Sequence, residues 1–204
     1  MAPRSAVNPG TVDWSGENPC MYLKERDDGP FVTLASFFRV VYSPKGRGHA
    51  LVLIEAPQAK ASRADALNVV ITDNEPLARW LIADYASHFQ AFKGAAALSN
   101  LEYRLLTSAV ASGDPSATYV ETIQGESFEA RLSWEKVGQP FMAEVPPDKS
   151  ATGKHWMFSL LAGAERGTIT ANGRRLKGHA VPRDMFGRAV TSAFLAFSET
   201  WVRA

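Results

Sequence analysis

The sequence predicts a mainly β fold of the α+β class, an antiparallel calycin-like β-barrel or strongly curved sheet with one long amphipathic helix. Three observations predict it. Short runs rich in β-branched and aromatic residues recur along the chain. Turn residues such as Gly, Pro and Asn-Gly separate these runs. A single central stretch spaces its apolar residues as a helix does.

The expected strands are segments in which apolar, β-branched and aromatic residues dominate. They cover residues 31–42, 49–56, 67–72, 102–110, 117–124, 127–136, 155–161, 167–171, 174–181 and 193–202. Apolar and polar residues alternate most clearly in FEARLSWE, within residues 127–136, which predicts a strand with one face in water. Asn172-Gly173 separates two such runs and supplies the positive φ angles of a type I′ turn, so we expect a hairpin there.

The helix is expected to begin at Asp73-Asn74-Glu75-Pro76, which combines a capping side chain, an acidic residue and a first-turn proline. Apolar residues then recur at three- and four-residue spacing from Leu77 to Phe92 and form one stripe. Gly94 is expected to end the helix. A short second helix is expected over residues 95–100.

Length and composition exclude several other classes of protein. A chain of 204 residues with 46% hydrophobic residues is long enough for one domain with a substantial core. Lys and Arg number 22 against 21 Asp and Glu, so no net charge attracts nucleic acid or anionic lipid. One cysteine excludes an intramolecular disulfide and a cysteine-built zinc site. No apolar run approaches the roughly 18 residues of a membrane span.

The first twenty residues hold three prolines and two glycines without periodicity. We therefore expect an irregular arm over residues 1–20, followed by a single β-barrel-like domain over residues 21–204. The beginning of the chain lacks the apolar stretch of a secretory signal, so we expect a cytoplasmic protein. Cys20, at the edge of this arm, is expected to be an ordinary thiol.

Motifs for dinucleotides, nucleotide phosphates, zinc proteases and α/β-hydrolases are absent from the sequence. The four histidines, His49, His88, His155 and His179, are far apart in the sequence, and nothing in their spacing indicates a metal. We therefore expect no metal and no cofactor. His88 lies on the helix stripe, where a packing role is the main alternative to catalysis.

Polar residues on apolar faces indicate the candidate site. In the expected last strand, Glu199 is the one charged residue on a face that it shares with Phe197 and Trp201. Glu121 shares a face with Tyr119 in the same way. A buried carboxyl has a raised pKa and can act as a general acid or base. The alternative for each carboxyl is exposure, or an ion pair with an arginine.

Arginines that could form such an ion pair include Arg39 and Arg104. The segment GHAVPRDMFG adds His179, Arg183 and Asp184 just after the predicted hairpin. Loops that leave barrel strands often carry binding groups. The alternative for this segment is a turn with an Arg183–Asp184 surface pair. The candidate catalytic residues are therefore Glu199, Glu121, His179 and Asp184, and the candidate ligand-binding residues are Arg183, Phe197, Trp201 and Tyr119.

The passage from Gly167 to Gly187, which contains Asn172-Gly173, Gly178 and Asp184, resembles part of the AttH-like and carotenoid-hydratase lipocalin superfamily. Phe186 stands where that superfamily usually has tryptophan. The resemblance implies a calycin-type barrel with an apolar cavity. It also implies that Asp184 is a polar group at the mouth of the cavity.

A second passage, from Asn68 to Lys93, resembles the acetoacetate-decarboxylase-like β fold in its order of strand, Asp-Asn turn and helix. The activity of that family requires a lysine that forms a Schiff base, in a Pro-Lys-Lys context. This chain has Phe92-Lys93-Gly94 in the corresponding region. The resemblance therefore implies the fold, and the chemistry would require that Lys93 is made nucleophilic by desolvation.

Three functions remain open after the sequence alone. The leading interpretation is binding of a small apolar or amphipathic molecule in a β-barrel cavity, for which 11 Phe, 5 Trp and 5 Tyr could supply the lining. The second is a cofactor-independent acid–base enzyme on the same scaffold, such as a hydratase, an isomerase or a decarboxylase-like lyase. The third is an interaction module that forms a homodimer through an exposed apolar face.

Overall fold

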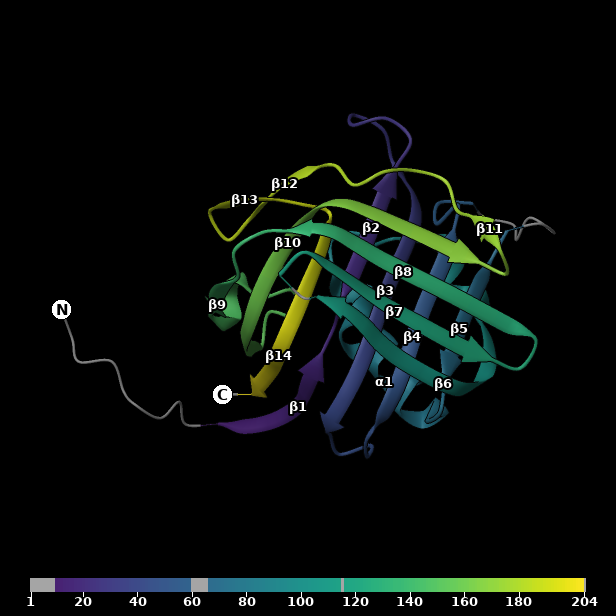
Figure 1. Cartoon of the computed structure of the whole chain (residues 1–204). Coiled ribbons are helices and arrows are strands. Elements are labelled where there is room, and N and C mark those ends of the chain that lie inside the picture. Colours follow the sequence, from purple (N-terminus) through teal and green to yellow (C-terminus); the bar gives the residue numbers. More distant parts are fainter. Residues whose placement is uncertain (1–9, 60–65, 115, 204) are drawn as a thin grey trace.

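A computed structural model describes residues 10–59, 66–114 and 116–203 and contains a closed ring of nine strands (Figure 1). In hydrogen-bonding order the ring consists of β14 (Ala193–Arg203), β2 (Cys20–Lys24), β3 (Phe31–Tyr42), β4 (Gly48–Glu55), β5 (Asn68–Thr72), β6 (Glu102–Asp114), β7 (Thr118–Gly125), β8 (Phe128–Val137) and β10 (His155–Ala171), which pairs with β14 again. The prediction of a mainly β, barrel-like fold is confirmed.

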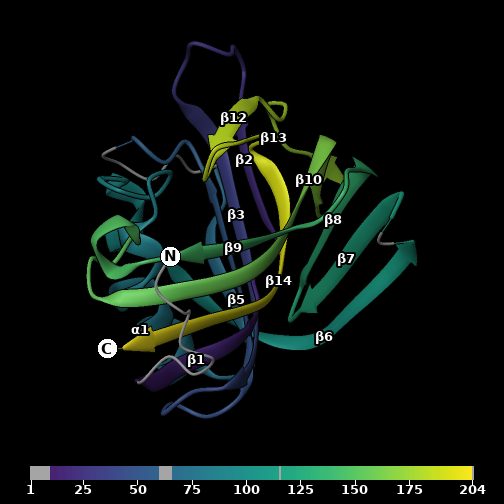
Figure 2. The same ribbon diagram turned by 90° about the vertical axis from the view of Figure 1, so that its left-hand side faces the viewer.

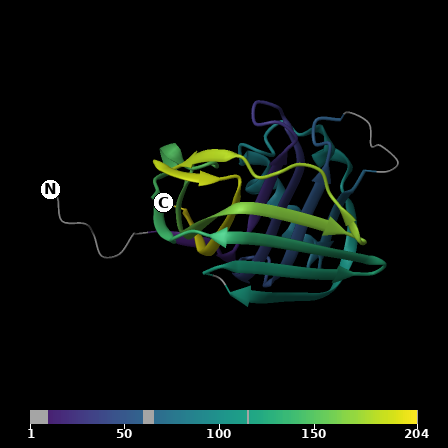
Figure 3. The same cartoon turned by 45° about the horizontal axis from the view of Figure 1, so that its top comes forward.

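Further strands extend or decorate this ring. They are β1 (Thr11–Glu17), β9 (Phe141–Val145), β11 (Arg174–Arg175), β12 (Pro182–Met185) and β13 (Arg188–Thr191). Within the described residues, strands β12 and β13 pair only with each other and form a separate hairpin. Figure 3 shows this hairpin, in yellow, outside the wall of the barrel.

The helical residues lie in the connection between β5 and β6, which are parallel neighbours. Parallel strands require a crossover rather than a tight turn, and this crossover holds α1 (Glu75–Asp84), η1 (Ala86–His88) and η2 (Ala96–Asn100). The predicted start is confirmed, because Asn74 Oδ1 accepts the backbone N–H of Leu77 at 3.1 Å. Among the described residues, no helix has the length and apolar content that crossing a membrane requires.

The expectation of an irregular arm up to residue 20 is wrong for residues 11–17 and for Cys20, which belong to strands. β1 and β2 are two halves of one interrupted strand, because both lie between β14 and β3. The interruption falls at Asn18-Pro19, where proline has no N–H to donate. Residues 1–9 of the expected arm lie outside the described residues.

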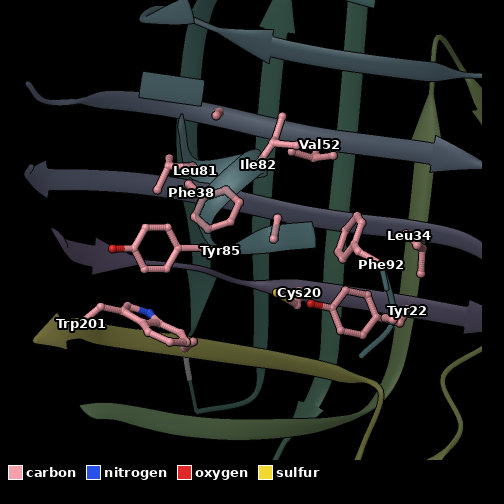
Figure 4. Packing of buried hydrophobic residues seen from close by; sticks show 14 of the residues in the cluster. Cys20, Tyr22, Leu34, Phe38, Val52, Leu81, Ile82, Tyr85, Phe92 and Trp201 are labelled. Atoms are coloured by element: carbon pink, nitrogen blue, oxygen red, sulfur yellow. The ribbon is translucent and has the colours of Figure 1, made fainter. Parts of the chain in front are cut away.

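Two apolar cores lie on opposite sides of the β2–β5 wall. Figure 2 shows the strands of this wall in profile. One fills the barrel, with side chains from the strands of the ring that include Met21, Phe37, Leu53 and Trp134, each with no exposed surface. The other lies outside the barrel, where α1 covers the wall and the ends of β10 and β14 curve around it (Figures 2 and 4). The structure therefore has an outer layer as well as a filled barrel.

The hairpin predicted at Asn172-Gly173 is confirmed. Both residues have positive φ, 48° and 74°, and Ala171 pairs with Arg174 across a two-residue loop. The strand expected over residues 174–181 is shorter than predicted, because only Arg174 and Arg175 continue the pairing. The chain then leaves β10 and meets β2 at one bridge between Lys24 and His179.

Replacing Gly173 with valine is expected to lower the free energy of unfolding by about 1–2 kcal/mol. No atom lies within 4 Å of the position of an added Cβ, so the cost comes from the left-handed backbone alone. Urea denaturation would measure it, with Gly138→Val, which lies outside the left-handed region, as the control. Equal stability of the two variants would contradict the expectation.

Candidate functional site

A cavity of about 360 Å³ opens in the outer layer, between the β2–β14 wall and the segments that cover it. Such volumes are typical of small-molecule sites. The walls come from the outer faces of β2 and β14, the chain after α1, the β9–η3 region (η3, Pro147–Lys149) and the β12–β13 hairpin. None of the lining residues belongs to the core inside the barrel. We therefore correct the expected location of this space: it lies on the outer side of the barrel.

The lining residues divide by chemistry. The apolar ones include Phe89, Val145, Met157, Leu161, Met185 and Phe194. The buried polar ones are Asn18, Cys20, Tyr22 and Glu199. The basic ones, at the exposed or half-buried rim, are His88, Lys93, Lys149 and Arg183.

Glu199 reaches this cavity because β14 is not regular. Ser198 has a φ of 50°, and the pairing with β10 shifts between Phe158 and Leu160. One extra residue in a strand turns the side chains that follow it to the opposite face of the sheet. Glu199 and Trp201 therefore lie on the outer side, while Phe197 packs with the barrel core. The predicted common face of these three residues is wrong, although the prediction of a carboxyl among apolar neighbours is confirmed.

Glu199 is 5% exposed, so its carboxyl is almost entirely removed from water. Burial raises its pKa to about 7, although hydrogen bonds from Trp201 and Asn18 act in the opposite direction. The Trp201 indole Nε1 donates to Glu199 Oε1 at 2.6 Å. At neutral pH its protonated and ionised forms are therefore both populated.

Cys20 and Tyr22 complete the polar floor of the cavity and are labelled in Figure 4. Burial raises the pKa of the Cys20 thiol to about 12, and it raises the pKa of the Tyr22 phenol well above its usual range. Cys20 Sγ lies 3.2 Å from the backbone carbonyl of Asn18, to which it donates. Both groups are therefore neutral at physiological pH, which agrees with the expectation of an ordinary thiol.

Arg183 brings a positive charge to two aromatic residues of the cavity. Its guanidinium carbon lies 6.0 Å from the ring centroids of both Tyr22 and Phe194. The residue is half-buried in β12, so one side of the guanidinium packs on the rings while the group remains at the rim of the cavity. The β12–β13 hairpin thus positions a positive charge over an apolar pocket.

Glu121, Tyr119 and Phe197 lie elsewhere, in or against the core of the barrel. Glu121 accepts both a 2.6 Å hydrogen bond from the Tyr119 hydroxyl and bonds from Arg39 Nη2 at 2.9 Å to each carboxylate oxygen. The second interpretation offered for Glu121, an ion pair with Arg39, is therefore the arrangement present. These residues stabilise the barrel core and do not line the cavity.

His179 and Asp184 are exposed and do not line the cavity. His179 Nε2 lies 2.8 Å from Asp27 Oδ1, and Asp184 Oδ1 accepts the backbone N–H of Gly187 at 3.1 Å. Asp184 thus stabilises the turn of the β12–β13 hairpin. The structure brings together three of the eight candidates, namely Glu199, Arg183 and Trp201.

The sequence did not identify Asn18, Tyr22 and Lys149 as site residues, nor most of the apolar residues that line the cavity. Asn18 was part of the expected arm, and Tyr22 was assigned to no element. The apolar run CMYL directly after Pro19 is the signal that could have identified a strand interrupted by proline. In the part of the chain that the structure describes, no three His, Cys, Asp or Glu side chains gather in an arrangement that could hold a metal ion.

No family model and no curated protein matches the chain. A solved structure described as "Structural Studies of Acetoacetate Decarboxylase" aligns with 100% of this chain and 92% of its own chain, at 10% identity and a TM-score of 0.35. A likeness at this TM-score and identity assigns the chain to no family. The function is therefore argued from the geometry of the cavity.

Proposed function

We propose that this protein binds a small amphipathic molecule, an apolar body with one anionic group, in the cavity between the β2–β14 wall and the β12–β13 hairpin. The observation that carries the proposal is the arrangement of charge. One buried carboxyl, Glu199, lies in an apolar pocket, and basic side chains stand at its rim.

The apolar walls favour a ligand with a hydrocarbon part. Met157, Leu161 and Phe194 are each less than 9% exposed and face the cavity from β10 and β14. Apolar ligand surface that leaves water for such a site contributes roughly 25 cal/mol per Å². An aliphatic chain of moderate length therefore fits the chemistry of these walls.

The rim favours an anion. Arg183, Lys93 and Lys149 reach the cavity from three different segments of the chain. A guanidinium offers two parallel N–H donors to a carboxylate or phosphate, and a lysine adds a mobile positive charge. Glu199 opposes an anion when it is ionised, so binding is expected to be tightest below the pKa of Glu199.

Replacing Arg183 with glutamine is expected to weaken binding of octanoate at pH 6 by roughly tenfold, the equivalent of one charge-assisted hydrogen bond. Isothermal titration calorimetry would measure the dissociation constant. Arg188→Gln is the matched control, because Arg188 lies on the other strand of the same hairpin and does not line the cavity. 1-Octanol serves as the neutral probe. Equal affinity for octanoate and 1-octanol, or equal effects of both substitutions, would contradict an anion site.

A second candidate function is acid–base catalysis on the bound molecule. One observation favours it: a buried carboxyl with a pKa of about 7 can both give and take a proton near neutral pH. Transfer of solvent deuterium into bound 2-octanone, lost in Glu199→Gln, would support it. Exchange at the rate of free solution would reject catalysis and leave a binding protein.

A further inference from the structure

A second group of polar side chains lies beside the cavity, on the far side of Trp201. Its members are Asp13 of β1, His155 at the start of β10, and Thr152 in the loop before β10. His155 Nε2 lies 2.7 Å from Asp13 Oδ2, and His155 Nδ1 lies 2.8 Å from Thr152 Oγ1. The Trp201 ring packs edge-on against the imidazole, with centroids 6.0 Å apart. A hydroxyl, an imidazole and a carboxylate therefore form one continuous hydrogen-bonded line.

The surroundings fix which atom carries which proton. Asp13 also accepts from Arg203 Nη2 at 2.6 Å and from the Tyr85 hydroxyl at 3.2 Å. Although burial acts in the opposite direction, hydrogen bonds from His155 and Arg203 hold the pKa of Asp13 below its ordinary value.

An ionised Asp13 has no proton to donate, so in neutral His155 the proton resides on Nε2 and Nδ1 has a free lone pair. The only hydrogen-bond partner that the structure gives Nδ1, among the described residues, is the Thr152 hydroxyl, which must then be the donor.

The hydroxyl is placed at the edge of the cavity. Thr152 is half-buried, whereas His155 is 1% exposed. Ser150 and Ala151, the two preceding residues, both line the cavity, and Ser150 Oγ lies 3.4 Å from Thr152 Oγ1. Thr152 itself is not among the lining residues, so an acyl compound in the cavity would reach its hydroxyl past Ser150 and Ala151.

We propose that Thr152 is a nucleophile for acyl groups, with His155 as its general base and Asp13 as the residue that positions the imidazole. Thr152 Oγ1 forms a bond to the acyl carbon of an activated ester or thioester, and its proton moves to His155 Nδ1. The bond from the acyl carbon to the leaving oxygen or sulfur breaks, and the imidazolium returns the proton to that leaving group. Water then attacks the acyl-threonine with His155 again as base, which releases the acid and restores the hydroxyl.

The alternative is a structural role, in which these hydrogen bonds only hold the loop before β10 against β1. The experiment must separate the two roles. The full chain is mixed with 4-nitrophenyl butyrate, the release of 4-nitrophenolate is followed in time, and the protein is quenched in acid and mapped by mass spectrometry. We expect a burst close to one equivalent and a butyryl group on the peptide that contains Thr152.

Thr152→Val should lose both the burst and the label, while Thr152→Ser should keep them, and His155→Gln should slow the burst by roughly 100-fold or more. Thr168→Val is the matched control, since it makes the same change at a half-buried position of β10 that lies outside this network. Thermal melting and circular dichroism identify any variant that fails to fold.

A wild-type protein without a burst, or a label that persists in Thr152→Val, would overturn the proposal. A purely structural role predicts no burst in the wild type and changes only in the melting temperatures of the variants. The proposal does not rest on the ligand proposed above, because octanoate has no leaving group and its affinity is measured separately. Failure of either proposal therefore leaves the other intact.

Discussion

Replacing Arg39 with methionine is expected to lower the free energy of unfolding by about 3–5 kcal/mol, the usual cost of leaving a buried charge without its partner. Glu121 has no exposed surface, and Arg39 meets both of its oxygens at 2.9 Å. Although burial alone would lower the pKa of the Arg39 guanidinium, Glu121 raises it above its ordinary value. The guanidinium is therefore a fixed positive charge, which methionine would remove while keeping most of the side-chain volume.

Urea denaturation at pH 7 would measure the change. Arg166→Met is the matched control, because Arg166 pairs with Glu135 on the outside of the barrel, where both side chains are exposed. Exposed pairs contribute about 0–1 kcal/mol, so this variant should retain nearly full stability. The double variant Arg39→Met, Glu121→Leu should recover part of the loss. If Arg39→Met lost less unfolding free energy than Arg166→Met, the Arg39–Glu121 pair would not stabilise the fold.

This pair illustrates what the sequence could predict about Glu121. Alternation along residues 117–124 placed Glu121 on a face with Tyr119 but left its burial open, and the structure shows that its side chain is buried. The function of a buried carboxyl depends on its partner, and the partner Arg39 comes from a strand that is 82 residues away in the sequence. No local pattern encodes such a distance, which is why catalysis and an ion pair were both open.

The strands and turns were the most predictable part of the fold, and the errors have local physical causes. Residues 155–161 and 167–171 were expected as two strands, but they belong to the single strand β10. Gly163 lies between these two segments, and Gly167 begins the second. An added Cβ at Gly163 would lie 3.0 Å from the Val190 Cβ, and one at Gly167 would lie 2.8 Å from the Ala193 Cβ. These glycines allow close packing within a strand rather than a turn.

The helix shows a similar limit. The apolar stripe predicted a helix that continues to Phe92, whereas α1 ends at Asp84 and η1 follows. The aromatic residues after this point pack on separate partners: Tyr85 and Phe89 on Trp201, and Phe92 on Tyr22. Tertiary contacts of this kind override helical spacing, and they also form one side of the cavity.

The location of the cavity could not be read from the sequence for a related reason. Ser198 is a non-glycine residue with positive φ, and no sequence signal marks it as a bulge. Without the bulge, Glu199 would face into the barrel beside Phe197 rather than toward Asn18 and Trp201. A single backbone irregularity thus decides which of the two cores receives the carboxyl.

Replacing Glu199 with glutamine is expected to raise the free energy of unfolding, relative to the wild type at the same pH, more at pH 8 than at pH 5. The difference between the two effects should be about 2–3 kcal/mol. The pKa of Glu199 is about 7 in the folded protein, against an ordinary value of 4.5. Between these two values the unfolded chain releases the proton and the folded protein keeps it. The folded state therefore binds more protons, and its stability falls as the pH rises through this window.

Glutamine is neutral at every pH and can still accept the hydrogen bond that the Trp201 indole donates to Glu199 Oε1. The variant should therefore lack this contribution to the pH dependence, while all other titrating groups act equally in both proteins. Urea denaturation at pH 5 and pH 8 gives the four free energies that the comparison needs. Glu135→Gln, at a partly exposed position of β8, is the control for loss of a carboxyl outside the cavity. If the difference between Glu199→Gln and the wild type were the same at both pH values, Glu199 would have an ordinary pKa, and the proton chemistry proposed for the cavity would lose its physical basis.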